Sequence, residues 1–284
     1  MGIVQSFIQP DAEPSTEFFA PSAQIPREIS ALSSADAREA LAAAEEVDEY
    51  RAACERCAQN KAARRLMDYS TRAPPTDLQY NLLRLTEGLP AWLKRTLPHR
   101  ISIACLSSSA DGGMPHTRHG PIVCFPQYFQ FDGAPAQTTF NHEMVHIHQR
   151  THAAVWDSLY ERLWQFRRYE GTVPDELLPR IRLNPDTIMQ PLYVWRGTWI
   201  PLPVFTRPEN PVIGAAKVIW YNVRTGEWQQ VTPPEFADEF GVLTEAEAEH
   251  PHELAAYWLS EPVGTGPVSN ARRLLEDAVE NLGK

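Results

Sequence analysis

The 284-residue chain is predicted to adopt an α+β fold. Residues 27–69 are rich in Ala, Glu and Arg and contain no Pro or Gly, a composition that favours helix. Short apolar runs at 101–106 and 121–126 are typical of strands, and further strand-like segments with aromatic residues follow within 192–232. Together these helix- and strand-forming segments indicate a mixed fold with small sheets.

The order of the segments predicts three parts. Residues 1–26 carry many Pro, Ser and Ala without a sustained period and are expected to form a flexible arm. Residues 27–98 are expected to form a helical extension, with one long helix or a helical pair over 27–69 and another helix over 77–97. Residues 99–284 are expected to form the catalytic domain. The whole chain, with 43% hydrophobic content, can bury one sizeable core, and no linker divides it cleanly in two.

The catalytic part is expected to begin with two strands joined by a polar loop. The apolar runs 101–106 and 121–126 flank this Gly-rich loop at 107–120. It contains His116 and Arg118, which are candidates for contacting a substrate. The alternative is a simple connection whose polar side chains are solvated.

The next segment carries the most informative motif, H-E-x-x-H at residues 142–146, preceded by a helix-start signal at Pro135. On a helix, positions four apart lie about 40° apart around the axis and roughly 6 Å along it. The imidazoles of His142 and His146 can therefore bind one metal ion. Glu143, rotated by about 100° from His142, can reach a water on that ion without being a ligand itself. The motif predicts metal-assisted hydrolysis, with a structural His pair as the alternative.

The chain beyond the motif is predicted to continue as helix, to turn, and then to form strands and closing helices. No Pro or Gly interrupts residues 136–170, and apolar residues recur at helical spacing over 156–169. Asn184-Pro185-Asp186 predicts a turn. The predicted strands are 192–204, 217–223 and 228–232, the last two joined by a hairpin turn at 224–227, and the predicted helices are 234–240, 245–260 and 267–282.

Residues 100–260 resemble a zincin metallopeptidase of the gluzincin type, through His142, Glu143, His146 and Glu253. The resemblance implies a Zn²⁺ ion bound by the two histidines and Glu253, and a peptide or protein substrate. It also implies that Glu143 acts as the general base for the zinc-bound water, whose pKa the metal lowers.

The same resemblance implies roles for residues outside the motif. In zincins a sheet edge beside the metal pairs with an extended substrate, so the loop at 107–120 is expected to border the cleft. An oxyanion donor is expected across that cleft, and Tyr257 and His116 are the candidates. Gln149 and Arg150 are expected to tie the metal-binding helix to its neighbours.

The third metal ligand has more than one candidate. Gluzincins take it as a Glu from a later helix, followed by small residues, and Glu253 fits because two alanines follow shortly and Pro251 can open the helix. Metzincins carry a third His at the position of His152, but they have Gly where this chain has Gln149. On an unbroken helix His152 points elsewhere. Further candidates are Glu249, His250, His252 and Asp157.

Two other functions stay open at this stage. Two histidines and one carboxylate can also hold iron and serve an oxidative reaction. The second alternative is a catalytically silent, lipid-anchored scaffold, because the first six residues match the N-myristoylation pattern with Gly2 as acceptor. No basic cluster follows Gly2, so membrane association through this residue alone would be weak.

The composition limits the classes of binding partner and the cellular compartments that are expected for this protein. A net charge of −10 and a pI near 5.4 argue against a nucleic-acid partner. No apolar run reaches the roughly 18 residues that span a membrane, and the first residues lack a secretory signal, so a cytoplasmic protein is expected. Cys54 and Cys57 have no second pair at zinc-ribbon spacing, and a disulfide between Cys105 and Cys124 is not expected in a reducing compartment.

Overall fold

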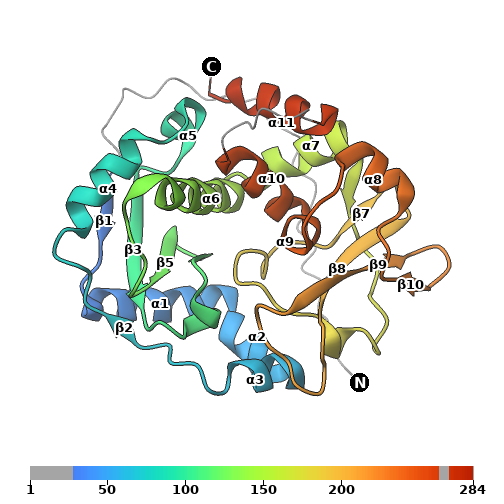
Figure 1. Cartoon of the computed structure of the whole chain (residues 1–284), viewed down its shortest axis with the longest axis horizontal. Helices are drawn as coiled ribbons and strands as arrows, with labels where there is room; N and C mark the ends of the chain where they lie inside the picture. The colour runs from blue at the N-terminus through green and yellow to red at the C-terminus, as the bar shows by residue number, and fades with distance from the viewer. Residues whose placement is uncertain (1–27, 262–268, 284) are drawn as a thin grey trace.

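The computed structural model describes residues 28–261 and 269–283, which form an α+β fold with two small sheets, as predicted (Figure 1). The flexible arm expected at 1–26, with its candidate acceptor Gly2, lies outside the described residues.

The first sheet contains the strands beside the helix that carries the H-E-x-x-H motif. Its strands are β1 (Glu28–Ala31), β2 (Thr71–Arg72), β3 (Arg100–Leu106), β4 (His116–Arg118) and β5 (Ile122–Pro126). The order is β1-β3-β5-β4, with β2 paired to part of β3, and β1, β3 and β5 run parallel. The antiparallel strand β4 forms one edge. The two predicted strands are confirmed, whereas the intervening loop contains β4 and a 3₁₀ turn at Ala110–Gly113, neither of which was predicted.

The segment predicted as one long helix or a helical pair was interpreted wrongly in part. It begins with strand β1, which pairs with β3, so one sheet contains residues from both sides of the expected boundary at 98/99. Three helices follow, because Glu49 adopts a left-handed conformation (φ 48°) and Cys57 is extended. They are α1 (Ser34–Asp48), α2 (Tyr50–Arg56) and α3 (Ala58–Arg64).

The second predicted helix, over 77–97, is also two helices, α4 (Leu78–Glu87) and α5 (Ala91–Thr96). The break falls at Gly88 and Pro90, where Pro90 is the extended cap that precedes α5. A Pro at this place cannot continue the preceding helix, because it lacks the N–H group that the helix requires.

The segment with the H-E-x-x-H motif forms α6 (Gly133–Thr151), followed by α7 (Ala153–Trp164). The expectation of unbroken helix was wrong at two points. His152 leaves the helical conformation with φ −125° and ψ 44°, and Gln165 ends α7 in a left-handed conformation. Residues 166–168, predicted as helix, form strand β6 instead.

The second sheet is antiparallel in the order β10-β9-β8-β7-β6 (Figure 1). Its strands are β6 (Phe166–Arg168), β7 (Tyr193–Trp195), β8 (Trp199–Phe205), β9 (Ala216–Asn222) and β10 (Trp228–Gln229), and a 3₁₀ turn lies at Leu178–Arg180. The segment 192–204, predicted as one strand, is two strands, because Arg196 and Gly197 turn the chain with positive φ. The predicted hairpin between β9 and β10 is confirmed.

Four helices complete the described chain, α8 (Pro234–Phe240), α9 (Glu245–Ala248), α10 (Pro251–Ser260) and α11 (Asn270–Glu280). The predicted helix over 234–240 is confirmed residue for residue. The helix predicted over 245–260 is divided into α9 and α10, because Pro251 starts a new helix after the extended residue His250.

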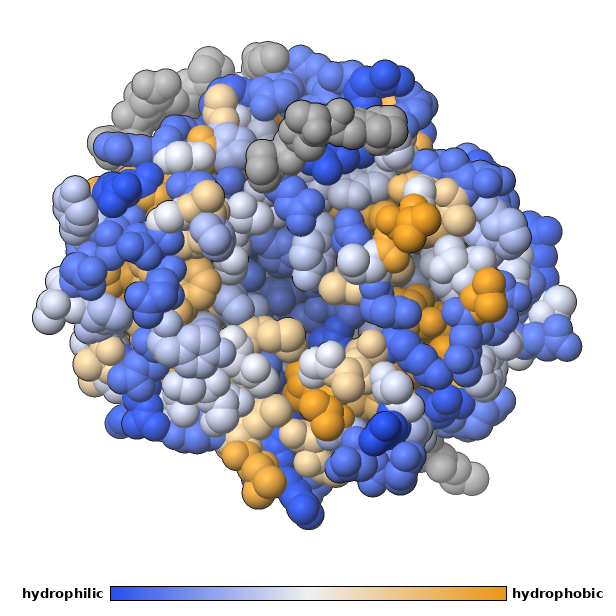
Figure 2. Space-filling model, viewed as in Figure 1, coloured by the Kyte–Doolittle hydropathy of each residue, from blue (hydrophilic) through white to orange (hydrophobic). Residues whose placement is uncertain are grey.

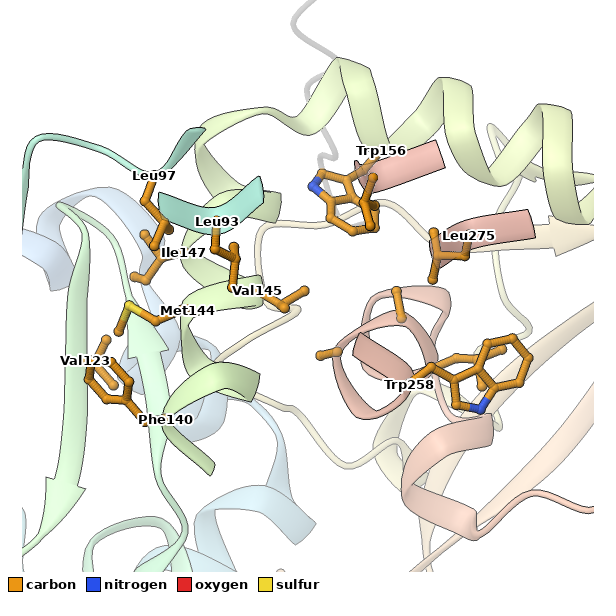
Figure 3. Close-up of a cluster of buried hydrophobic side chains, with 14 of the residues drawn as sticks. Leu93, Leu97, Val123, Phe140, Met144, Val145, Ile147, Trp156, Trp258 and Leu275 are labelled. Atoms are coloured by element: carbon orange, nitrogen blue, oxygen red, sulfur yellow. The ribbon is translucent and has the colours of Figure 1, made fainter. Parts of the chain in front are cut away.

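The core of the protein surrounds α6 on two sides (Figure 3). Phe140, Met144 and Ile147 of α6 are fully buried, and Phe140 and Met144 lie beside Val123 of β5. Val145 points away from that sheet, toward the side of α10. Burial of each large apolar side chain contributes roughly 1.5–3 kcal/mol. These contacts fix the rotation of α6 and therefore the direction in which its histidines point.

The four cysteines are free. Cys105 belongs to the core on the α6 side of the first sheet, whereas Cys124 packs on the opposite face, against α1, so the two side chains lie on different faces. Within the described residues, no helix combines the length and the apolar character that a membrane span needs.

Candidate metal centre

His142 and His146 lie one turn apart on α6, on the side away from Met144. Their Nε2 atoms are 3.0 Å apart. The His142 side chain is 14% exposed and lines a cavity, whereas the His146 side chain is 1% exposed and is enclosed by the protein. The i, i+4 geometry expected from the motif is therefore present.

Glu253 joins the two histidines from the first turn of α10. Its Oε2 atom is 3.4 Å from Nε2 of His142 and 3.5 Å from Nε2 of His146. Ala255 and Ala256, which follow it, are fully buried in the core shared with α6. Small side chains at these positions permit α10 to approach α6 closely enough for the carboxylate to reach the imidazoles.

The three candidate ligand atoms lie close enough together to hold one metal ion. His142, His146 and Glu253 offer atoms that all lie within 4.8 Å of one another. Nitrogen and oxygen ligands about 2.0–2.2 Å from a tetrahedral zinc ion are about 3.3–3.5 Å apart. The separations of 3.4 and 3.5 Å between Glu253 and the histidines lie in this range, and the 3.0 Å between the two imidazole nitrogens is shorter. The donor set of two imidazoles and one carboxylate fits a divalent metal ion.

Electrostatics favour an ionised carboxylate at this place. Burial alone would raise the pKa of Glu253, but His146 and His142 beside it outweigh burial and lower the pKa well below its usual range. Burial likewise opposes protonation of His146, but the carboxylates of Glu253, Asp186 and Glu143 together outweigh burial and raise the pKa to about 10. Without a metal ion, a proton on the His146 imidazole therefore supplies positive charge beside the carboxylate.

Gln149 fixes the orientation of the His146 ring. Its Oε1 atom is 2.7 Å from Nδ1 of His146 and accepts a hydrogen bond when that nitrogen carries the proton. Its Nε2 atom donates to the hydroxyl of Tyr160 and to the backbone carbonyl of His252, the residue before Glu253. When His146 is neutral, this contact favours the tautomer with the proton on Nδ1, which leaves on Nε2 the lone pair that a metal ligand needs.

Asn184 supports the carboxylate from the far side. Its side-chain amide donates 2.8 Å hydrogen bonds to Oε1 of Glu253 and Oε1 of Glu249. Arg182 in turn forms an ion pair with Glu249. The sequence predicted only a turn at 184–186, and no local pattern indicated that its first residue would form a hydrogen bond to Glu253.

Glu143 lines a cavity of about 300 Å³ together with His142 and Glu253. Its Oε2 atom is buried and has no hydrogen-bond partner among the described residues. Burial, and next the nearby carboxylate of Asp186, raise the pKa of Glu143 well above its usual value. A divalent cation beside it would oppose this shift. Figure 2 shows the molecule hollowed near the middle of this face, with hydrophilic residues on the floor.

Tyr257 and His116, the two candidate oxyanion donors, both line this cavity. The ring of Tyr257 packs edge-on against that of His142, with centroids 4.6 Å apart. His116 is engaged on both ring nitrogens: Nδ1 lies 3.1 Å from the carbonyl of Met114, and Nε2 lies 3.7 Å from Oδ2 of Asp111. Burial opposes protonation of His116, but Cys124 and Asp111 outweigh it and raise the pKa to about 10.

Other candidates for the third metal ligand lie apart from His142, His146 and Glu253. His152 follows the end of α6 and its Nε2 atom is 3.0 Å from the carbonyl of Thr96. Asp157 pairs with Arg168 on the far side of α7.

The remaining candidates on α9 and α10 have other partners. Glu249 pairs with Arg182 at the cavity wall, and Nε2 of His250 lies 3.2 Å from the carbonyl of Pro191. His252 is buried in an aromatic cluster with Tyr160.

Arg118, expected as a substrate contact, is instead a structural residue. It is 2% exposed and binds Asp48 and Glu45 of α1 through its guanidinium group. The expectation failed because Arg118 pairs with carboxylates of α1, about seventy positions earlier in the chain, and does not line the cavity.

No family model, curated protein or solved structure matches this chain. Its function is therefore inferred from the geometry of the site.

Proposed function

We propose that this protein is a zinc-dependent hydrolase, specifically a metallopeptidase that cleaves peptide bonds. One observation carries the proposal: His142, His146 and Glu253 present three ligand atoms within 4.8 Å of one another, beside a cavity that Glu143 also lines. A structural His pair does not need a buried, unpartnered carboxylate next to it, whereas a hydrolytic site does.

Hydrogen bonds from neighbouring side chains orient the residues that would bind the metal ion. His142, His146 and Glu253 would hold it, with Gln149 orienting one imidazole and Asn184 the carboxylate. When bound, a zinc ion makes water more acidic and polarises a carbonyl group.

Glu143 is the general base in this proposal. Its Oε2 atom accepts the proton of the attacking water and then delivers it to the nitrogen of the leaving amine. Since Oε2 is buried and makes no competing hydrogen bond among the described residues, nothing has to be broken before proton transfer. General base catalysis of this kind contributes about 10²–10⁴-fold to the rate.

Tyr257 is the better of the two candidate oxyanion donors. Burial and the neighbouring Glu253 raise the pKa of its hydroxyl, which therefore keeps its proton and can donate a hydrogen bond to a developing oxyanion. His116 would first have to give up its contacts with Asp111 and the carbonyl of Met114. Its role in the proposal is to hold the cavity wall.

The test begins with metal content. Protein purified without added ions is expected to carry about one zinc per chain, and His142→Ala and His146→Ala are expected to lose it. Elemental analysis of these variants decides the point, and full zinc occupancy in both would refute the site. Iron in place of zinc would instead favour the oxidative alternative, which the same donor set permits.

Activity is tested on a library of fluorogenic peptides with the zinc-loaded protein. A catalytically silent scaffold would cleave none of them, and its biological function would survive Glu143→Gln. We place this activity in the cytoplasm, because all four cysteines are free thiols and reducing compartments keep them so.

A further inference from the structure

The edge strand β4 runs beside the metal-binding helix, where a substrate strand would have to pair. In its antiparallel register with β5, His116 faces Cys124 and Arg118 faces Ile122. Successive residues of a strand direct their backbone groups to opposite sides. The groups of Thr117, between these two, therefore point outward to the edge.

Each outward N–H group along this edge is already used or missing. Pro115 has no N–H group. The N–H of Thr117 donates to Oδ1 of Asp186 at 2.6 Å, and that of His119 donates to Oδ2 of Asp48 at 3.2 Å. The outward carbonyl of Thr117 is also occupied, since it accepts from Arg150 at 3.2 Å. A second strand would find no free donor here.

The turn at 184–186 covers this edge. Arg150, one turn beyond His146 on α6, binds the carbonyl of Pro185 as well as the side chain and carbonyl of Thr117. Asp186 binds the hydroxyl of Thr117 in addition to its N–H. Because Asn184 at the start of this turn also holds the metal-binding carboxylate, displacing the turn would disturb the metal centre itself.

The space that remains is small. The cavity beside the histidines measures about 300 Å³, at the lower end of the roughly 300–1,000 Å³ range of ligand pockets. Met114, Pro115 and His116 form its wall at the beginning of β4, and Pro185 and Asp186 close it on the side of the covered edge. An extended substrate strand needs about 3.3 Å of free strand edge for each residue that pairs. The covered part of β4 has no free edge for such pairing.

We propose that the site acts on short amides, of the size of a di- or tripeptide or a chain end that fits the cavity, and that it excludes internal bonds of extended polypeptides. This inference rests on the proposed hydrolytic function and adds the substrate class. The covered edge, and not the metal ligands, sets the limit on substrate length.

Binding of two matched transition-state analogues tests the inference without depending on turnover. One is a phosphinic pseudodipeptide with Ala on each side of the phosphinate, and the other is an octapeptide with the same central pair. Calorimetry with the zinc-loaded full-length protein is expected to show the short analogue binding at least tenfold more tightly. Equal or tighter binding of the octapeptide overturns the proposed substrate class and leaves the hydrolytic site in place.

A different result refutes the proposed function. If neither analogue binds to the protein with its zinc in place, the metal is not accessible to an amide analogue. This result would refute both the hydrolytic function and the substrate class.

Two variants at Asp186 test the cause of the length limit. Asp186→Ala removes the acceptor and frees the N–H of Thr117, whereas the matched control Asp186→Asn keeps an acceptor oxygen at the same place. One freed backbone bond is expected to improve octapeptide binding by about two- to tenfold in Asp186→Ala alone. An unchanged octapeptide affinity in a folded Asp186→Ala protein overturns the role of the covered edge. If that variant does not fold, the comparison of the two analogues on the unaltered protein decides.

Discussion

Replacement of Gln149 by Met should weaken zinc binding although residue 149 is not a ligand. Met has a similar length but cannot accept the proton of Nδ1 of His146, 2.7 Å from Oε1 of Gln149. His146 is only 1% exposed, so no water from the surface can take over this bond. Leaving a buried donor without a partner costs about 1–3 kcal/mol. His146 avoids this cost by moving its proton to Nε2, which is the atom that should bind the metal.

The expected loss of zinc affinity follows from that cost. A difference of about 1–3 kcal/mol corresponds to roughly 5–150-fold, and loss of an outer partner of a metal-binding His costs about 10–100-fold in other proteins. We therefore expect Gln149→Met to bind zinc roughly 10–100-fold more weakly, measured by titration with a competing chelator.

Tyr160→Phe is the matched control for this variant. It removes the 3.2 Å bond between the Tyr160 hydroxyl and Nε2 of Gln149, but leaves the bond to His146 intact. Its zinc affinity should stay within about threefold of the original, since a neutral bond of this kind contributes about 0.5–1.5 kcal/mol to folding rather than to the metal. Wild-type affinity in Gln149→Met, or an equal loss in Tyr160→Phe, would refute the reasoning.

Three further outcomes are expected. Glu143→Gln should keep its zinc and lose about 10²–10⁴-fold in peptide hydrolysis, because the amide cannot accept a proton; unaltered turnover would show that another group is the base. In a titration with a competing chelator, the zinc affinity of Glu253→Ala should fall by several orders of magnitude, whereas that of His152→Ala should stay unchanged. The reverse result would place the third ligand at His152. Burial would raise the pKa of Asp48, but the interaction with Arg118 is stronger and lowers the pKa. The ionised carboxylate therefore stabilises the fold at any pH above its unfolded pKa of about 3.9. This contribution to stability is lost as the pH falls through the lower pKa of the folded state. Asp48→Asn should cost about 3 kcal/mol at pH 7 and flatten the decline of unfolding free energy below pH 4, as measured by urea titration at each pH.

The parts of the site that sequence could predict depend on local patterns. The motif at 142–146 predicted both the helix and the shared face of its histidines, because helical spacing alone determines that geometry. Glu253 was predicted because Pro251 and the following alanines mark a helix start with a close-packing face. Both signals lie within a few residues of the side chains that they place.

The parts that sequence missed depend on distant contacts. Strand β1 has only four residues, and its hydrogen-bonding partner β3 lies about seventy positions further along the chain. The end of α6 at His152 has no Pro or Gly to mark it, and Nε2 of His152 lies next to the carbonyl of Thr96 on another helix. Asn184 and Asp186 looked like ordinary turn formers, because their side-chain partners belong to α10 and β4.

Gln149 links the two helices that provide the ligands. In metzincins a glycine occupies the position of Gln149 and ends the helix, so that a third histidine can reach the metal. A glycine has no side chain that could be buried at this position. In this chain α6 runs on to Thr151, so residue 149 is buried beneath His146. Its amide then binds His146 on one side and the carbonyl of His252, adjacent to Glu253, on the other. In the proposed site, the residue that stands in place of the metzincin glycine thus connects one histidine to the backbone beside Glu253.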